Sequence, residues 1–138
     1  MNTDKMKVVS GVIVQHGNKV LMCKRAENQS YGGQWSIPMG HLRSGESPLN
    51  GLRREFYEET DIKLTGDIKL IDIITKENGT IIYVYYKNSG KELNPDLENA
   101  KDGREHSECG YFSYDELPFD EDDNDEIYKI IRKVLGGK

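Results

Sequence analysis

The chain has 138 residues, a length that fits one compact domain with a core large enough to fold without disulfide staples. Its hydrophobic content of 36% and charged content of 31% are typical of a globular protein, and its longest apolar run is too short to span a bilayer. The net charge of −5 argues against a protein that coats nucleic acid, but not against one that binds an anionic small molecule through a metal ion.

The cysteine content and the first residues bear on the compartment. Cys23 and Cys109 are too few for a disulfide framework, and neither belongs to a C-x-x-C pair. Residues 1–5 lack the charged-then-apolar pattern of a secretory leader. We therefore expect a protein of the reducing cytoplasm, without a membrane partner.

Strands dominate the first third of the sequence. Residues 7–15 are β-branched and apolar, His16-Gly17-Asn18 is a turn signal, and residues 19–24 return as a second strand. Polar, glycine-bearing loops then flank one short extended piece; the loops cover residues 25–33 and 39–45, and the extended piece covers residues 34–38.

A helix with clear signals at its start comes next. Ser47 before Pro48 predicts an N-cap with proline at the first helical position. Apolar residues then recur at spacings of three and four and build one stripe, at Leu49, Leu52 and Phe56. The pattern predicts a helix that continues to about residue 60.

The remaining segments predict a mixed sheet with helices on its faces. Strands are expected at residues 69–74 and 80–86 around an Asn78-Gly79 turn, and a second helix at residues 125–135. Between them we expect a long surface loop, a short strand and a turn, at residues 88–104, 111–114 and 115–118. No internal repeat or interdomain linker is visible, so the prediction is a single domain over residues 1–138.

Three carboxylates of the first helix are the informative feature. At about 100° per residue, Glu55, Glu58 and Glu59 fall within roughly one third of the helix circumference. Like charges four residues apart, and anions in the last turn of a helix, each oppose helix formation by a few tenths to about 1 kcal/mol. The alternative is a charged solvent face, but the position favours a bound cation. A ligand set made only of oxygen donors favours Mg²⁺, Mn²⁺ or Ca²⁺ over zinc or copper.

The segment from residue 40 to residue 62 resembles the Nudix box, G-x5-E-x7-R-E-U-x-E-E-x-G-U, where U is a bulky aliphatic or similar residue. The matching positions are Gly40, Glu46, Arg54, Glu55, Phe56, Glu58, Glu59 and Ile62. Residues 35–40 and 111–118 also resemble the segments that flank the box in this family. The resemblance implies an α+β Nudix fold, an α/β/α sandwich with a central mixed β-sheet.

Two positions depart from the family pattern. Asp61 stands where the family has glycine at the helix C-cap, a left-handed position that Asp tolerates at a cost of about 1 kcal/mol. Met39 replaces the first glycine of a pair whose backbone carbonyl binds metal in the family. Neither change removes a carboxylate of the box.

The resemblance also implies an activity. Enzymes of this family hydrolyse a nucleoside diphosphate linked to another group, with Mg²⁺ as cofactor and Mn²⁺ as a substitute. MutT-like nucleoside triphosphates are the leading substrate class for this chain. The alternatives are an ADP-ribose, dinucleotide or nucleotide-sugar pyrophosphatase, and a catalytically silent domain that senses a nucleotide. The expected partner is a small nucleotide rather than a nucleic acid, and the protein is expected to be a monomer or a homodimer.

The same resemblance assigns roles to residues. The catalytic set is Arg54, Glu55, Glu58, Glu59 and Glu105, and the metal ligands are the three glutamates of the helix, Glu105 and the Met39 carbonyl. Glu105 is preferred over Glu108 as the further base or ligand outside the box; ordinary loop charge is the alternative for both. Gly40 and Glu46 are expected to support the site, with Glu46 paired to Arg54.

Candidates for substrate binding are spread over the chain. Lys24 and Arg25 could meet phosphates, and His41 directly follows Gly40 and so lies near any bound phosphate. Trp35 could stack on a base or belong to the core. Asp123 and Asp125 could read a purine edge, and the alternative for these two residues is the start of the last helix.

Overall fold

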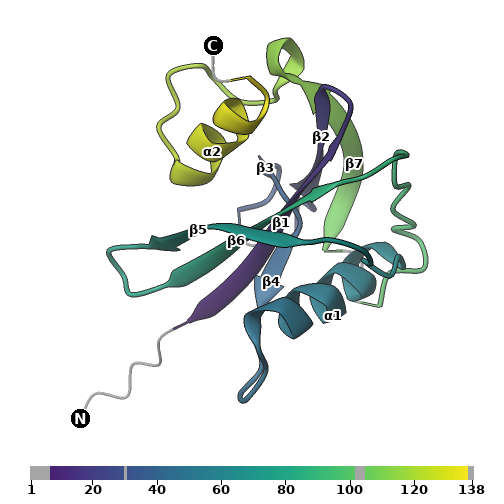
Figure 1. Ribbon diagram of the computed structural model, residues 1–138, viewed down its shortest axis with the longest axis vertical. Coiled ribbons are helices and arrows are strands. Elements are labelled where there is room, and N and C mark those ends of the chain that lie inside the picture. Colours follow the sequence, from purple (N-terminus) through teal and green to yellow (C-terminus); the bar gives the residue numbers. More distant parts are fainter. Residues whose placement is uncertain (1–6, 30, 102–104, 137–138) are drawn as a thin grey trace.

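The computed structural model describes residues 7–29, 31–101 and 105–136. A seven-stranded sheet forms its centre (Figure 1). The strands are β1 Val8–His16, β2 Lys19–Arg25, β3 Trp35–Ser36, β4 Met39–His41, β5 Lys69–Thr75, β6 Ile81–Asn88 and β7 His106–Ser113. The remaining elements are α1 Pro48–Thr60, the short 3₁₀ helix η1 Tyr114–Glu116 and α2 Glu126–Val134.

The sheet is mixed, as predicted. Its main path runs β3-β2-β1-β6-β5, with β1 parallel to β6 and the other pairs of described strands antiparallel. β1 and β2 pair only beside their hairpin turn, at Gln15 with Val20 and at His16 with Lys19. Further from the turn, β1 pairs with β4 and β2 pairs with β3, while β7 pairs along the whole of β2. The sheet therefore branches at the end where the candidate site residues lie.

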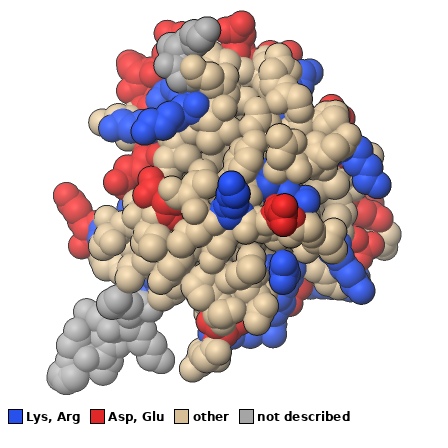
Figure 2. Space-filling view, in the orientation of Figure 1, with Lys and Arg blue, Asp and Glu red and all other residues tan. Residues whose placement is uncertain are grey.

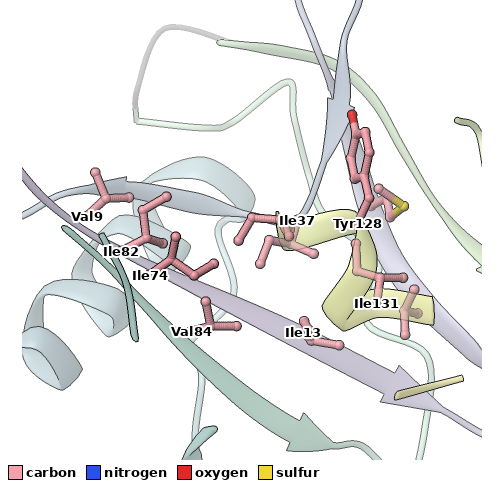
Figure 3. Packing of buried hydrophobic residues seen from close by; sticks show 11 residues of the cluster. Val9, Ile13, Ile37, Ile74, Ile82, Val84, Tyr128 and Ile131 are labelled. Carbon is pink, nitrogen blue, oxygen red and sulfur yellow. The ribbon is translucent and has the colours of Figure 1, made fainter. Parts of the chain in front are cut away.

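The two helices cover opposite faces of the sheet (Figure 1). Leu52 and Phe56 of α1 pack in one buried cluster with Val12 and Val14 of β1. The other cluster contains Ile131 of α2 together with inward-facing residues of β1, β5 and β6 (Figure 3). Because β1 is covered on both faces, it reads as a continuous β-branched run rather than an alternating one. The α/β/α sandwich is confirmed.

The start and end of each helix follow the local signals in the sequence. The Ser47 side chain accepts a hydrogen bond from the Asn50 N–H at 3.2 Å, with Pro48 at the first helical position. Asp61 ends α1 in the left-handed conformation, with φ of 63°. Asp125 caps α2 by accepting from the N–H groups of Ile127 and Tyr128. These side chains supply bonds that the helix termini cannot make internally.

Two segment predictions needed correction. The predicted loop at residues 39–45 contains β4, which pairs with β1. The last strand begins at His106 rather than at residue 111, because its polar first half pairs with the end of β2. In both cases a partner strand that is distant in sequence stabilises a segment with weak strand propensity of its own. The predicted loop at 88–104 is confirmed for residues 89–101, while residues 102–104 lie outside the described part.

Cys23 and Cys109 face each other on neighbouring strands. The β2–β7 register places them opposite one another, and the structure joins them in a disulfide. A single cross-strand bond is not a disulfide framework, and the sequence could not reveal it because the two residues are 86 positions apart.

In the described parts of the chain, no helix is long and apolar enough to span a bilayer.

Candidate functional site

Glycine allows α1 to lie close against β4. A Cβ atom at Gly40 would overlap the carboxyl group of Glu55, so only glycine leaves room for that side chain. One turn earlier on α1, a Cβ atom at Gly51 would overlap the side chain of Leu42. The close approach places the carboxylates of α1 beside the backbone of β4.

Arg54 is the centre of a network of carboxylates. Its Nε donates to Glu46 Oε2 at 2.7 Å and its Nη2 donates to Glu46 Oε1 at 2.9 Å. Its Nη1 lies 3.1 Å from both Glu55 Oε2 and Glu58 Oε1. Nη2 also donates to the His41 carbonyl oxygen at 3.1 Å. The guanidinium therefore ties the loop before α1, the strand β4 and two glutamates of α1 into one unit.

The network shifts the protonation equilibria of its members. Two hydrogen bonds from Arg54, supported by one from the Arg43 N–H, lower the pKa of Glu46 to about 2. The same contacts raise the pKa of Arg54 further above its usual value. Burial raises the pKa of Glu55, although the hydrogen bond from Arg54 opposes this shift. Glu46 is thus firmly ionised, whereas Glu55 is an anion that its surroundings incompletely stabilise.

Glu59 is a buried carboxylate beside this network. The residue is only 2% exposed, and none of the described residues donates a hydrogen bond to its Oε1 atom. Burial of a carboxylate is costly unless neighbouring groups or a cation compensate its charge. The donors gathered here, carboxylates and the carbonyl groups of β4, are all oxygen, which suits Mg²⁺ or Mn²⁺.

The carboxylates do not yet converge as ligands. Among the described residues, no group of three or more Asp, Glu, His or Cys side chains stands close enough to hold a metal ion. Glu55 and Glu58 instead point to Arg54, which occupies one oxygen of each. The donor set fits a hard divalent cation, and the space that Gly40 leaves around Glu55 is where such an ion would need room.

A cavity of about 680 Å³ opens beside the network. Its lining comes from β1–β4, β7, the β5–β6 hairpin and both α-helices, and includes Met39, Gly40, His41 and Glu55. The predicted candidates Arg25, Glu105 and Asp125 also line it. The structure therefore brings these seven residues together, although they lie up to 100 positions apart in sequence.

Glu105 directly precedes β7 and lies beside the end of β2. Its Oε1 is 3.3 Å from Nη1 of Arg25, and its carbonyl oxygen accepts a hydrogen bond from the Ala26 N–H at 2.8 Å. Its charge also raises the pKa of Glu55 across the cavity. Glu108, by contrast, is 59% exposed and lies 3.9 Å from Lys24 Nζ. Glu108 and Lys24 stand outside the cavity lining, whereas Glu105 and Arg25 belong to it.

Two other predicted substrate residues lie apart from the cavity. Trp35 packs edge-to-face on Phe112, with ring centroids 5.1 Å apart, and belongs to the core. Asp123 is exposed and accepts from the Asp125 N–H, which orders the loop before α2. Asp125 does line the cavity, but its Oδ1 is the N-cap of α2 and its Oδ2 lies 4.0 Å from Lys76 Nζ.

The sequence reasoning missed several lining residues. Lys76, Asn78 and Thr80 of the β5–β6 hairpin face the cavity, as do Gln34 and Ser36 around β3 and Tyr128 of α2. The Tyr128 hydroxyl donates to the Trp35 carbonyl oxygen at 2.7 Å, which fixes α2 against β3. No sequence signal marks the hairpin residues, because Asn78-Gly79 is also the signature of any tight turn.

Comparison with known proteins agrees with the fold. A sequence model of the NUDIX domain matches residues 4–134. The crystal structure of a MutT NUDIX hydrolase from Burkholderia pseudomallei has a TM-score of 0.74 at 21% identity, covering 95% of this chain and 99% of that one. A MutT protein from Methanosarcina mazei has a TM-score of 0.66 at 20% identity, covering 98% and 96%.

Curated relatives match over shorter segments. An 8-oxo-dGTP diphosphatase from Proteus vulgaris is 32% identical over 77 residues, which is 56% of this chain and 68% of that protein. A MutT-like protein from Streptomyces ambofaciens is 39% identical over 59 residues, 43% of this chain and 36% of the relative's length. An RNA pyrophosphohydrolase from Bartonella henselae is 36% identical over 53 residues, 38% and 30% of the two chains. With the domain match covering nearly its whole length, the chain belongs to the NUDIX family.

Proposed function

We propose that this chain is a Mg²⁺-dependent pyrophosphohydrolase of a small nucleotide, with nucleoside triphosphates as the leading substrate class. One observation carries the proposal: Glu55, which shares Arg54 with Glu58 on α1, lines a cavity that also contains Arg25 and Glu105. This arrangement offers sites for a divalent cation, for a phosphate group and for a proton acceptor in one place. Phosphoanhydride hydrolysis requires these three functions.

Each residue then has a defined task. Glu55, Glu58 and Glu59 would hold the cation together with the Met39 carbonyl, and Arg54, itself fixed by Glu46, keeps Glu55 and Glu58 in place. When bound, Mg²⁺ neutralises phosphate charge and makes phosphorus more open to attack. The bidentate Glu46–Arg54 pair acts on rate through geometry, because small displacements of catalytic groups are costly.

Glu105 is the proposed general base. It lines the same cavity as Glu55, and its carboxylate would accept the proton of the attacking water. Arg25 lies 3.3 Å from Glu105 and would bind a phosphate oxygen of the substrate, with Lys76 and His41 as further donors at the cavity wall. A bound phosphate and Glu105 would therefore share Arg25.

The cavity supports a small substrate. Its volume of about 680 Å³ lies in the range of small-molecule pockets, and Gln34, Ser36 and Asn78 offer uncharged donors and acceptors suited to a base. On the face seen in Figure 2, basic and acidic side chains are interspersed rather than segregated. The Proteus relative, an 8-oxo-dGTP diphosphatase, also favours a free nucleotide. We propose that the protein acts in the cytoplasm as a monomer or homodimer.

A substrate panel tests the proposal. It should contain nucleoside triphosphates including 8-oxo-dGTP, ADP-ribose, a dinucleoside polyphosphate, a nucleotide sugar and an RNA with a 5′-triphosphate. We expect release of pyrophosphate from a nucleoside triphosphate with Mg²⁺ or Mn²⁺, and loss of this release in EDTA. Reaction in ¹⁸O-labelled water identifies the attacked phosphorus from the product that carries the label.

Two outcomes would contradict the proposal. Faster turnover of the triphosphorylated RNA than of every free nucleotide would assign the substrate class of the Bartonella relative. Tight nucleotide binding without turnover of any compound would make the chain a nucleotide sensor. The Glu55, Glu58 and Glu59 positions are all retained, which favours an enzyme over a sensor.

A further inference from the structure

The loop at residues 89–101 is docked on the C-terminal end of α1. The Asp96 N–H donates to the Thr60 carbonyl oxygen at 2.8 Å, and the Lys101 N–H donates to the Glu58 carbonyl oxygen at 2.8 Å. Carbonyl groups in the last turn of a helix have no partner within the helix, so the loop supplies donors that α1 lacks. Of the two residues whose carbonyl groups accept these bonds, Glu58 is a proposed metal ligand.

Lys101 also brings a positive charge to this helix end. Its Nζ lies 2.9 Å from Asp61 Oδ1 and 5.0 Å from the centre of the Tyr57 ring. The hydrogen bond to Asp61 raises the pKa of Lys101. The last turn of α1 has no basic residue of its own although it carries Glu58 and Glu59. Lys101 therefore provides, from another segment, a cation of the kind that favours a helix C-terminus.

Asp61 is the partner that makes this contact possible. The residue has φ of 63°, a conformation in which glycine is unstrained and Asp is not. Glycine at this position would end the helix with less strain but could not bind Lys101. A strained residue with a specific polar contact points to a purpose beyond ending the helix.

Lys101 is separated from Glu105 by only three residues. Glu105 is fixed on its other side by β2, through its carbonyl oxygen to the Ala26 N–H and through its carboxylate to Arg25. The chain is therefore held at two described positions, by Lys101 at the end of α1 and by Glu105 beside the end of β2. Only three residues of chain join Glu105 to the contact of Lys101 with the helix that carries Glu55, Glu58 and Glu59.

We propose that Asp61 and Lys101 are positioning residues, which fasten the Glu105 segment to the end of α1 so that the Glu105 carboxylate is correctly placed against the carboxylates of the helix. The inference rests on the proposed function, because it takes Glu105 as the proton acceptor. It assigns no contact with substrate to either residue. Asp61 and Lys101 act on turnover only through Glu105.

The test compares Lys101→Ala and Asp61→Gly with the unmodified protein. We expect kcat to fall by about 3- to 10-fold in both variants with KM within about two-fold, since a displaced catalytic group slows the reaction without loss of substrate contacts. Lys101→Arg should restore most of kcat, because it keeps the charge and a donor. Lys63→Ala removes an exposed lysine close to the same helix end and is the matched control.

A double-mutant cycle tests whether the effect passes through Glu105. Lys101→Ala should lower kcat in the unmodified background but have no further effect in a Glu105→Gln background, because coupled residues are non-additive. Amide hydrogen exchange gives a readout that is independent of activity. The Ala26 N–H, which donates to the Glu105 carbonyl oxygen, should exchange faster in Lys101→Ala and unchanged in Lys63→Ala.

Several results would overturn the inference. Unchanged kcat in Lys101→Ala would do so, as would a full additional loss in the Glu105→Gln background. A general loss of folding is excluded if the unfolding midpoint of Asp61→Gly stays within about 2 °C of the parent or rises, as relief of strain predicts. Normal turnover of Glu105→Gln would overturn the inference and the role of Glu105 but leave the hydrolysis intact, whereas failure of the proposed function appears as absence of turnover in the unmodified protein.

Discussion

The two walls of the cavity are built in different ways. One wall includes Glu55, a member of the Glu46–Arg54–Glu55–Glu58 network. The members of this network lie within 13 positions of one another and are joined at 2.7 to 3.1 Å. The other wall combines the β5–β6 hairpin with α2, and its ion pairs from Lys76 to Asp125 and Glu126 are 3.9 to 4.0 Å long.

We infer from this difference that the first wall serves the chemical step and the second wall serves substrate recognition. A bidentate arginine and partly buried carboxylates form a rigid unit, because each bond limits the freedom of the others. Exposed pairs at about 4 Å restrict side chains weakly and contribute about 0–1 kcal/mol each. We expect substitutions on the first wall to change kcat and stability, and those on the second wall to change mainly KM.

The largest effect is expected at Glu59. Glu59→Gln keeps the shape of this buried side chain but removes its charge, so kcat should fall by at least about 100-fold while the fold is retained. Turnover, circular dichroism and Mn²⁺ affinity are the measurements. Near-normal turnover would show that Glu59 is not a ligand of the cation and would contradict the proposed difference between the two walls.

The Glu46–Arg54 pair gives a pH-dependent effect on stability. The pKa of Glu46 is about 2 in the fold against an ordinary value of 4.5, so its stabilising contribution is complete above pH 4.5 and is lost as the pH falls through 2. Glu46→Gln should lower the free energy of unfolding by about 1–3 kcal/mol at pH 7, and the difference from the parent should shrink between pH 4.5 and 2. Urea titrations at several pH values measure it.

A matched control for this prediction is Glu108→Gln. Glu108 is 59% exposed and 3.9 Å from Lys24, so its loss should change the free energy of unfolding by less than about 0.5 kcal/mol at every pH. Equal losses in the two variants would show that the Arg54 network has no special role in stability.

On the opposite wall, Lys76→Ala should raise KM by about 3- to 10-fold with little change in kcat, because it removes a cation that faces the cavity. The free energy of unfolding should change by less than about 1 kcal/mol. Lys129→Ala, at an exposed position of α2, is the control. A fall in kcat with constant KM would place Lys76 in the chemical step.

The smallest effect separates two roles of Asp125. Asp125→Ala removes the N-cap of α2 and should lower the free energy of unfolding by about 1 kcal/mol, whereas Asp125→Ser should retain most of it. If Asp125 acts mainly as the N-cap of α2, the KM of Asp125→Ser should stay within about two-fold of the KM of the parent protein. A larger increase in KM would assign the carboxylate to recognition of the nucleotide, as the sequence-based hypothesis about a purine edge requires.

Particular residues show where sequence reasoning succeeded. Ser47, Pro48 and Asp125 fix the ends of the helices through contacts within four residues, and local contacts can be read from a local sequence. The expected Glu46–Arg54 pair spans only eight positions and is present. The full length of β7, in contrast, depends on pairing with β2, some 85 positions away, which its own residues do not encode.

By itself the sequence determined the family resemblance, the two helices, the mixed sheet and the cluster of carboxylates on α1, because spacing along one helix fixes which side chains share a face. Only the tertiary structure decided that Arg25 and not Lys24 faces the cavity, that Trp35 belongs to the core, and that Lys76 and Lys101 stand where they do. These placements depend on which strands pair and where loops dock. Such contacts join segments far apart in the chain, and their free energy comes from burial and hydrogen bonding that no local pattern records.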